Sequence, residues 1–408
     1  MDSMSPHDSL AVLLPVVTPF VFVFGACVGS FLNVVIWRLP RGESLWRPPS
    51  HCPKCNHAIR AYENIPILSW LMLRGRCSQC RLPISMQYPV IELATALLFV
   101  AVWWAVCRQR LPPTVLIGDF YLAGAALSAA LIDVRHRRVP NAITYGGLIV
   151  AAAAALAFPA ARGLATADIL DLRPGQGFLT VALAERFLPA LARWPRGLAL
   201  ADVAFGAAMG GGFLLAVRLM AVPLWGYRRG RLAAPAAVTL TPQGVEIQGA
   251  VSATWEEMTA AMSDRLLVWI ENAEIEWAEG APAEGRAVLP RGRVRLVVED
   301  GWLKAGHKRI PLAHLRKVSG TTRAWARSVE VLGLGDVKLA AMIGALLGPD
   351  AMPFVLLLGG AVGLPCGLVV RAGVRGRRPG LPFAPFLAAG AVAWVLVGPD
   401  LLTAIMGQ

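Results

Sequence analysis

The clearest pattern along this chain is a series of long apolar segments separated by charged loops. A helix needs about 20 apolar residues to cross a bilayer, and eight segments reach that length with few or no ionisable side chains. The sequence therefore predicts an all-α polytopic membrane protein of about eight transmembrane helices. The expected helices are 10–37, 88–107, 111–133, 141–161, 197–227, 328–347, 351–370 and 379–399.

Two of the connecting segments are large. Loop 38–87 contains four of the seven cysteines, and we expect it to form a zinc-ribbon-like structure. Segment 228–327 is charged, and its apolar and polar residues alternate between Pro and Gly turns, which predicts a small inserted β-rich domain. Segment 162–196 is expected to be a loop. The predicted organisation is a first membrane helix (1–37), the cysteine loop (38–87), helices 2–5 (88–227), the inserted domain (228–327) and helices 6–8 (328–408).

Composition and charge agree with a membrane protein. Hydrophobic residues make up 56% of the chain and charged residues only 16%, whereas soluble domains average about 25% charged residues. The net charge of +13 does not require a nucleic-acid partner, because Lys and Arg collect in the cytoplasmic loops of membrane proteins. Eight of them lie in loop 38–87. We therefore expect this loop and the inserted domain in the cytoplasm and both termini outside.

The four cysteines of loop 38–87 form two pairs with the same spacing, Cys52 with Cys55 and Cys77 with Cys80. Each pair can present two thiolates on one turn, and two such turns complete a tetrahedral zinc site. The cytoplasm keeps thiols reduced, which favours zinc over a disulfide or a redox role, although the spacing alone leaves those alternatives open. A closed shell of four thiolates has no position for water, so the zinc would be structural.

Acidic residues within apolar segments are candidate functional groups, because a charge inside a bilayer is costly. Asp133 ends the third expected helix, and Asp336 lies about 12 Å below the expected start of the sixth. Two carboxylates at similar depth can share a proton, activate water and polarise a peptide carbonyl. Taken singly, Asp133 could pair with Arg135 or Arg137 instead. Asp336 could likewise form an ion pair with Lys338.

Together these motifs resemble those of the bacterial type IV prepilin peptidase family, which are leader peptidases and N-methyltransferases of the GxGD class of intramembrane aspartyl proteases. The resemblance covers the chain apart from two insertions. The similar segments are 25–40, the two cysteine pairs with 74–77, 88–92, 131–141 and the GxGD motif at 333–336.

The resemblance implies an activity and its participants. Asp133 and Asp336 would be the aspartyl pair that removes the short basic leader of type IV prepilins or pseudopilins, at the cytoplasmic face of the bacterial inner membrane. The new N-terminal residue would be methylated, with S-adenosylmethionine as the donor. The donor site is not identified. Glu92 is a candidate because it lies on the cytoplasmic side of the second expected helix, although it could equally pair with Arg81 or with backbone.

Two features depart from the family pattern. Asp133 and Asp336 are about 200 residues apart, farther than in typical members, because segment 228–327 is inserted between them. Arg135 stands where some members carry another acid. Two alternatives to the main interpretation are a leader peptidase without methylation and a non-enzymatic zinc-ribbon membrane scaffold. The intact set of four cysteines argues against the first. The second would tolerate the replacement of either aspartate by Asn.

Overall fold

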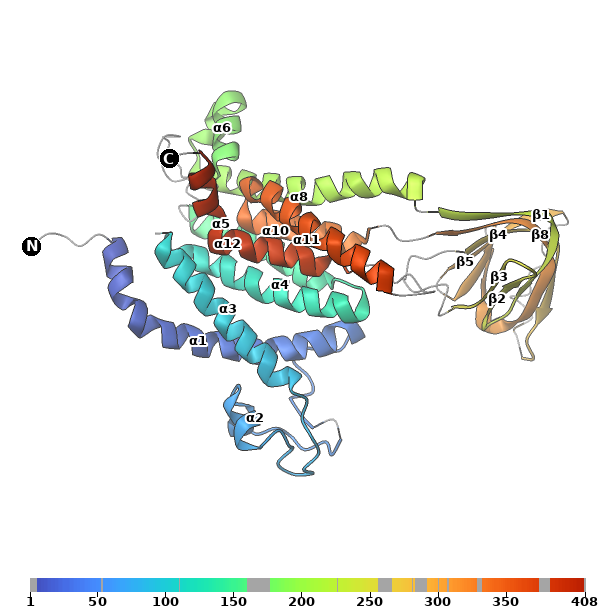
Figure 1. Cartoon of the computed structure of the whole chain (residues 1–408), viewed down its shortest axis with the longest axis horizontal. Coiled ribbons are helices and arrows are strands. Elements are labelled where there is room, and N and C mark those ends of the chain that lie inside the picture. Colours follow the sequence, from blue (N-terminus) through green and yellow to red (C-terminus); the bar gives the residue numbers. More distant parts are fainter. Residues whose placement is uncertain are drawn as a thin grey trace, which may run out of the picture. The chain divides into compact units, whose positions relative to one another are not determined.

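The structure is a computed structural model that describes residues 6–52, 54–109, 111–159, 177–225, 227–255, 266–280, 282, 292–299, 301–306, 308–328, 332–373 and 382–406. The chain divides into two compact units. The helical unit comprises Met1–Leu215, Leu334–Gly376 and Leu381–Gln408. The β unit comprises Ala216–Gly333 and Arg377–Gly380. Figure 1 labels their elements.

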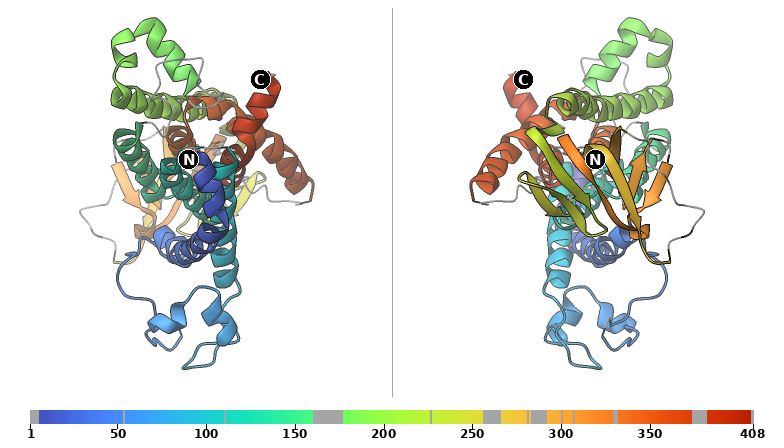
Figure 2. Two further views of the ribbon diagram at one scale, coloured as in Figure 1. Left: turned by 90° about the vertical axis from the view of Figure 1, so that its left-hand side faces the viewer. Right: turned by 90° about the vertical axis from the view of Figure 1, so that its right-hand side faces the viewer.

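The helical unit is built from long apolar helices that pack side by side (Figure 2). The last turns of α8 belong to the β unit. A short helix, α2 (Leu68–Met72), lies in the cysteine loop. The other helices are α1 (Pro6–Arg38), α3 (Gln87–Arg108), α4 (Leu116–His136), α5 (Asn141–Ala157), α6 (Phe178–Phe187), α7 (Pro189–Ala192), α8 (Pro195–Trp225), α10 (Leu334–Leu347), α11 (Met352–Gly373) and α12 (Ala384–Met406).

Within the described residues, six helices are long and apolar enough to cross a membrane. They are Leu14–Arg41, Gln87–Arg108, Pro113–His136, Pro195–Val222, Pro349–Cys366 and Ala384–Leu401. The fourth and sixth expected helices are present as α5 and α10, but both are shorter than a typical span. The prediction of about eight spans is therefore only partly matched. The expected boundaries at residues 161 and 379 lie outside the described residues.

The all-α class is only partly matched, because the described strands between Tyr227 and Ser328 form the eight-stranded sheet expected of the inserted domain. Two details of the sequence prediction were wrong. The sixth helix begins at Leu334 rather than at residue 328, because residues up to Ser328 pair as a strand. Asp336 consequently lies in the first turn of α10 and not two turns below its start. The expected loop 162–196 contains α6 and α7 in its described part.

Helices α1 and α3 pack closely because glycines of α1 face the backbone of α3. A Cβ atom on Gly25 would lie 2.8 Å from the Cα atom of Ala96, and one on Gly29 would lie 2.7 Å from that of Glu92. Both distances are too short for a side chain. Small residues four apart on one helix allow this backbone approach between membrane helices.

We expect the substitution Gly29→Ala to destabilise the helical unit by about 1–3 kcal/mol, the usual cost of overpacking. Gly124→Ala on α4 is the matched control, because its added methyl group would meet only Leu32, at 3.7 Å. Thermal unfolding in detergent compares the two variants. Equal midpoints would contradict the packing argument.

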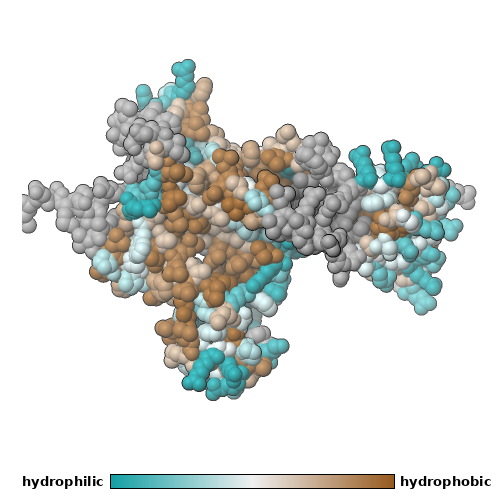
Figure 3. All heavy atoms as spheres, viewed as in Figure 1, coloured by the Kyte–Doolittle hydropathy of each residue, from teal (hydrophilic) through white to brown (hydrophobic). Residues whose placement is uncertain are grey.

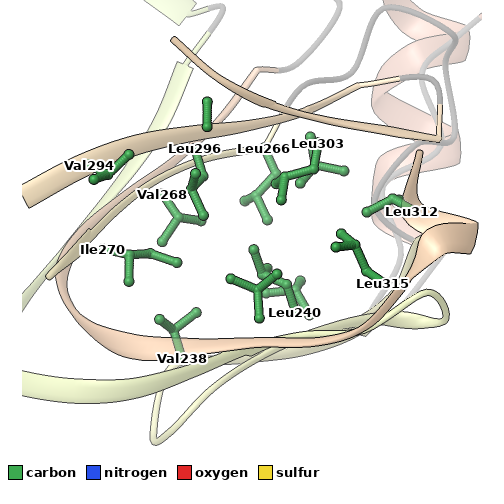
Figure 4. Close-up of a cluster of buried hydrophobic side chains, with 14 of the residues drawn as sticks. Val238, Leu240, Leu266, Val268, Ile270, Val294, Leu296, Leu303, Leu312 and Leu315 are labelled. Atoms are coloured by element: carbon green, nitrogen blue, oxygen red, sulfur yellow. The ribbon is translucent and has the colours of Figure 1, made fainter. Parts of the chain in front are cut away.

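The β unit is one antiparallel sheet with the strand order β3-β2-β1-β8-β4-β5-β6-β7. Alternating residues form its buried apolar core, and in Figure 4 side chains from different parts of the curved sheet point towards one another. The expected β-rich region is thus confirmed. The strands are β1 (Tyr227–Leu240), β2 (Gly244–Ile247), β3 (Val251–Thr254), β4 (Leu266–Trp277), β5 (Arg293–Glu299), β6 (Trp302–Ala305), β7 (Lys308–Pro311) and β8 (Leu315–Ser328).

The first and last strands of the β unit lie next to each other. Strands β1 and β8 pair from Tyr227 opposite Ser328 to Leu240 opposite Val318, with a bulge in between. In the helical unit, α8 and α10 also pack directly, with the backbones of Gly206 and Gly344 in contact.

Candidate functional site

The four-cysteine site consists of two turns with the same hydrogen-bond pattern. In the first, the amide of Cys52 donates to the carbonyl of His57, and the amide of Asn56 donates to the carbonyl of Cys52. In the second turn, both hydrogen bonds recur 25 residues later: the amide of Cys77 donates to the carbonyl of Leu82, and the amide of Arg81 donates to the carbonyl of Cys77. The residue after the last cysteine of each pair has positive φ, 60° at Asn56 and 57° at Arg81. This turn directs both sulfur atoms of a pair to one side.

The four sulfur atoms lie within 4.8 Å of one another. The Sγ atoms of Cys52 and Cys80 are 3.9 Å apart, and those of Cys55 and Cys77 are 4.0 Å apart. A tetrahedron with zinc–sulfur bonds of about 2.3 Å places its sulfur atoms about 3.8 Å apart, whereas a disulfide brings them to about 2.05 Å. The arrangement therefore fits a metal ion and not a disulfide.

Backbone amides also favour the thiolate form of the first cysteine in each pair. Hydrogen bonds from the amides of Cys55 and Lys54 lower the pKa of Cys52 to about 7. The amides of Cys80 and Gln79 likewise lower the pKa of Cys77. Thiolates are the form that binds zinc. The first cysteine of each pair is thus prepared for metal binding by the turn that follows it.

Glu63 connects the two turns. Its Oε2 atom lies 3.3 Å from Nε2 of His57 and accepts a hydrogen bond from the amide of Arg60 at 3.0 Å. The hydrogen bond from the Ser78 hydroxyl is the largest cause that lowers the pKa of Glu63, followed by the Arg60 amide. Ser78 belongs to the second cysteine turn and His57 to the first, so one carboxylate joins both.

We expect Glu63→Ala to weaken zinc binding by about 10–100-fold, the usual effect of losing a group that supports metal ligands. A competition titration with a coloured chelator measures this change. Glu43→Ala in the same loop is the control, because the Glu43 side chain is exposed and Glu43 lies outside both cysteine turns. The same zinc affinity in both variants would contradict a linking role for Glu63.

Glu92 anchors the cysteine loop to the helices. It lies in α3 with only 7% of its surface exposed, and its Oε2 atom accepts the amide proton of Ile67 at 2.7 Å. The hydroxyl of Ser30 on α1 also bonds to this carboxyl group. Ile67 has a φ of +64°, which is an outlier for a β-branched residue. The sequence suggested Arg81 or a backbone group as the partner of Glu92, and the structure shows a backbone group, the amide of Ile67.

Asp133 lies in the last turns of α4 and is 6% exposed. Its Oδ2 atom accepts a hydrogen bond from the amide of Ala384, the first residue of α12, at 3.2 Å. Arg137, which ends α4 with φ of +53°, lies close enough for its charge to act on this carboxylate. Nothing in the sequence pattern indicated that the start of α12 would meet Asp133.

Asp336 lies half-buried in the first turn of α10. The segment that follows α4 is the immediate neighbour of this turn. A Cβ atom on Gly335 would lie 3.2 Å from Cβ of Val139, and Nζ of Lys338 donates to Oδ1 of Asn141 at 2.9 Å. The structure thus places the first turn of α10 against the connection that begins four residues after Asp133.

Two other acids of the helices, the half-buried Asp119 and the buried Asp202, are separate from this region. Asp119 lies in the first turn of α4, about 21 Å along the helix axis from Asp133. Asp202 on α8 accepts a hydrogen bond from the Thr180 hydroxyl at 2.6 Å. Both line a cavity at the Asp119 end of α4 together with Gly177 and Leu347. They therefore belong to the opposite end of the helical unit.

The described structure defines a polytopic membrane protein with a cluster of four cysteines whose geometry fits a metal ion, and with two aspartates beside one interhelical connection. Residues 23–106 match the family described as the bacterial peptidase A24 N-terminal domain, and residues 307–368 match the type IV leader peptidase family. The second match contains Asp336, whereas Asp133 lies between the two matched ranges. These matches confirm the resemblance to the type IV prepilin peptidase family.

Curated relatives agree with this family. A prepilin leader peptidase/N-methyltransferase of Myxococcus xanthus is 47% identical over 146 residues, covering 36% of this chain and 42% of the relative. A type 4 prepilin-like proteins leader peptide-processing enzyme of Escherichia coli is 40% identical (32% and 55% covered), and a prepilin leader peptidase/N-methyltransferase of Neisseria gonorrhoeae is 38% identical (34% and 55%). The matched part spans about half the length of these relatives. No solved structure matches the chain.

Proposed function

We propose that this protein is a membrane-embedded aspartyl endopeptidase that removes the basic leader of type IV prepilins or pseudopilins and then N-methylates the new N-terminal residue. The proposal includes eight membrane helices, with α5 and α10 as the two short ones, in the bacterial inner membrane. The cysteine loop (38–87) and the inserted domain (228–327) would lie in the cytoplasm. The observation that carries this proposal is the contact of the GxGD turn of α10 with the segment after Asp133.

In this proposal Asp133 and Asp336 hydrolyse the peptide bond as a pair. One carboxylate is ionised and takes a proton from water, and the other is protonated and polarises the scissile carbonyl. The amide of Ala384 holds Oδ2 of Asp133, which fixes the orientation of this carboxyl group. The pair has shared titration behaviour, so neither residue is assigned as the base. Gly335 gives the close packing that α10 needs beside Val139.

The cysteine loop would hold a structural zinc ion through Cys52, Cys55, Cys77 and Cys80. The ion would supply folding free energy to a loop that has little apolar core of its own, and it would take no part in hydrolysis. S-adenosylmethionine would be the methyl donor. We do not assign its site to Glu92, because the carboxylate of Glu92 already bonds to Ile67 and Ser30.

The position of the aspartates suits a substrate with two different parts. A prepilin has an apolar helical segment that can lie in the bilayer and a charged leader that stays in water. Asp133 lies in the last turns of one candidate span and Asp336 in the first turn of another helix. Catalytic groups at helix ends lie at the boundary between lipid and water, where the bond between the two parts of the substrate would also lie.

An assay with a prepilin-like peptide, the detergent-solubilised full chain and S-adenosylmethionine tests the proposal. Mass spectrometry reports the loss of the leader and the gain of a methyl group as separate mass changes. We expect both. Leader removal without a methyl gain would support the peptidase alternative, and neither change with an active positive control would overturn the proposal in favour of a scaffold.

A further inference from the structure

The cysteine loop carries an exposed apolar surface that its metal site does not explain. Residues 64–73 contain no ionisable side chain. Among them, Leu68 and Leu71 are each 57% exposed, Met72 is 78% exposed and Ile65 is 44% exposed. Three of these four belong to α2. So many large apolar side chains on one short segment are typical of a surface that contacts protein or membrane.

The opposite side of α2 is attached to the rest of the loop. Ser69 is 6% exposed, and its hydroxyl donates to the carbonyl of Tyr62 at 3.0 Å. The indole of Trp70 donates to the carbonyl of Ile84 at 3.2 Å and packs over Gly75. These contacts fix the rotation of α2. The exposure of Leu68, Leu71 and Met72 is therefore set by the fold of the loop.

The hydrogen bond between Ile67 and Glu92 sets the depth of this segment. Glu92 lies five residues after Gln87, where a candidate membrane span begins, which corresponds to about 7.5 Å along the helix. The interfacial region of a bilayer is about 5–8 Å thick on each side. The amide of Ile67, the residue before α2, thus donates a 2.7 Å hydrogen bond to a carboxylate that lies at interfacial depth. Figure 3 shows hydrophobic surface on part of the cysteine loop as well as on the helices.

We propose that α2 and Ile65 form an interfacial membrane anchor, in which Ile65, Leu68, Leu71 and Met72 insert between phospholipids beside α3. The absence of charge from residues 64–73, the fixed rotation of α2 and the depth of Ile67 all favour lipid as the occupant. Polar residues of the loop, such as Lys54 and Gln79, are exposed near the cysteine turns. The anchor therefore holds the metal site at the membrane surface with its polar residues in water.

Photo-cross-linking in the full chain tests this anchor without any measurement of activity. A diazirine amino acid is incorporated at Leu71 or at Met72, and at Gln79 as the matched control on the same loop. The protein is reconstituted into phosphatidylcholine–phosphatidylglycerol vesicles and irradiated. We expect a phospholipid mass on the α2 peptide for Leu71 and Met72 and none for Gln79. Unchanged zinc content verifies that each labelled loop is folded.

Two results would overturn the anchor. Reaction of the Leu71 and Met72 labels with water alone, as at Gln79, would show that α2 lies outside the lipid. Replacement of the lipid adduct by a peptide adduct when a prepilin-like peptide is added would assign the apolar surface to a protein partner instead. The first result would leave the proposed peptidase activity unaffected, so failure of the anchor and failure of the proposed function are distinguishable.

Discussion

The replacement of Asp336 or Asp133 by Asn should abolish leader cleavage while the protein still inserts and folds. Asn keeps the size and most hydrogen bonds of Asp, but it can neither take a proton from water nor donate one to a carbonyl oxygen. General acid–base catalysis contributes about 10²–10⁴-fold, and we expect a loss of at least this size in each variant. The rate of leader removal, followed by mass spectrometry of a prepilin-like peptide, measures the effect.

Asp119→Asn is the matched control for this prediction, because Asp119 lies on the same helix as Asp133 but in its first turn. It should cleave at the wild-type rate. The double variant of Asp133 and Asp336 should be no slower than either single variant, because residues that act as one unit have non-additive effects. Undiminished cleavage by Asp336→Asn would refute the catalytic assignment and favour the scaffold alternative.

The replacement of Cys52 or Cys77 by Ser should release the metal and unfold the cysteine loop. Zinc binding to a four-ligand site contributes about 10 kcal/mol or more of folding free energy, and three remaining thiolates do not close the tetrahedron. We expect zinc content to fall from one ion per chain to near zero. Limited proteolysis should then cut between residues 38 and 87, and methylation and cleavage should both decline.

Cys27→Ser is the control for the cysteine variants. Cys27 lies on α1, is exposed and is not part of the cluster. The zinc content and the proteolysis pattern of the Cys27→Ser variant should match those of the wild-type chain. A Cys52→Ser variant that retained a full equivalent of zinc would show that the four cysteines do not form the metal site that their spacing and geometry support.

Much of this protein could be predicted locally. The apolar runs predicted where helices α1, α3, α4, α8, α11 and α12 lie, because burial in lipid requires nothing beyond length and hydrophobicity. Period-two alternation predicted the β unit for a similar reason, since successive side chains in a strand face opposite sides. The C-x-x-C spacing predicted the two cysteine turns, because both sulfur atoms of a pair are positioned by one short hydrogen-bonded segment.

Boundaries and long-range partners could not be predicted in this way. The sixth helix was expected to begin at residue 328, but pairing with β1 and β4 makes residues 315–328 a strand. A strand partner lies far away in the sequence, so local hydrophobicity does not reveal it. The amide of Ala384 beside Asp133 and the amide of Ile67 beside Glu92 are similar cases. A backbone donor has no residue type by which a sequence pattern could identify it.

The sequence by itself thus determined the class of the protein, the position of its apolar helices and the residues that can carry chemistry, because these depend on side-chain type and spacing. Only the tertiary structure decided which distant groups meet. It places the first turn of α10 against the segment after α4, and it pairs the first and last strands of the β unit, β1 and β8. Such contacts depend on packing between segments up to about 200 residues apart, and no local pattern encodes them.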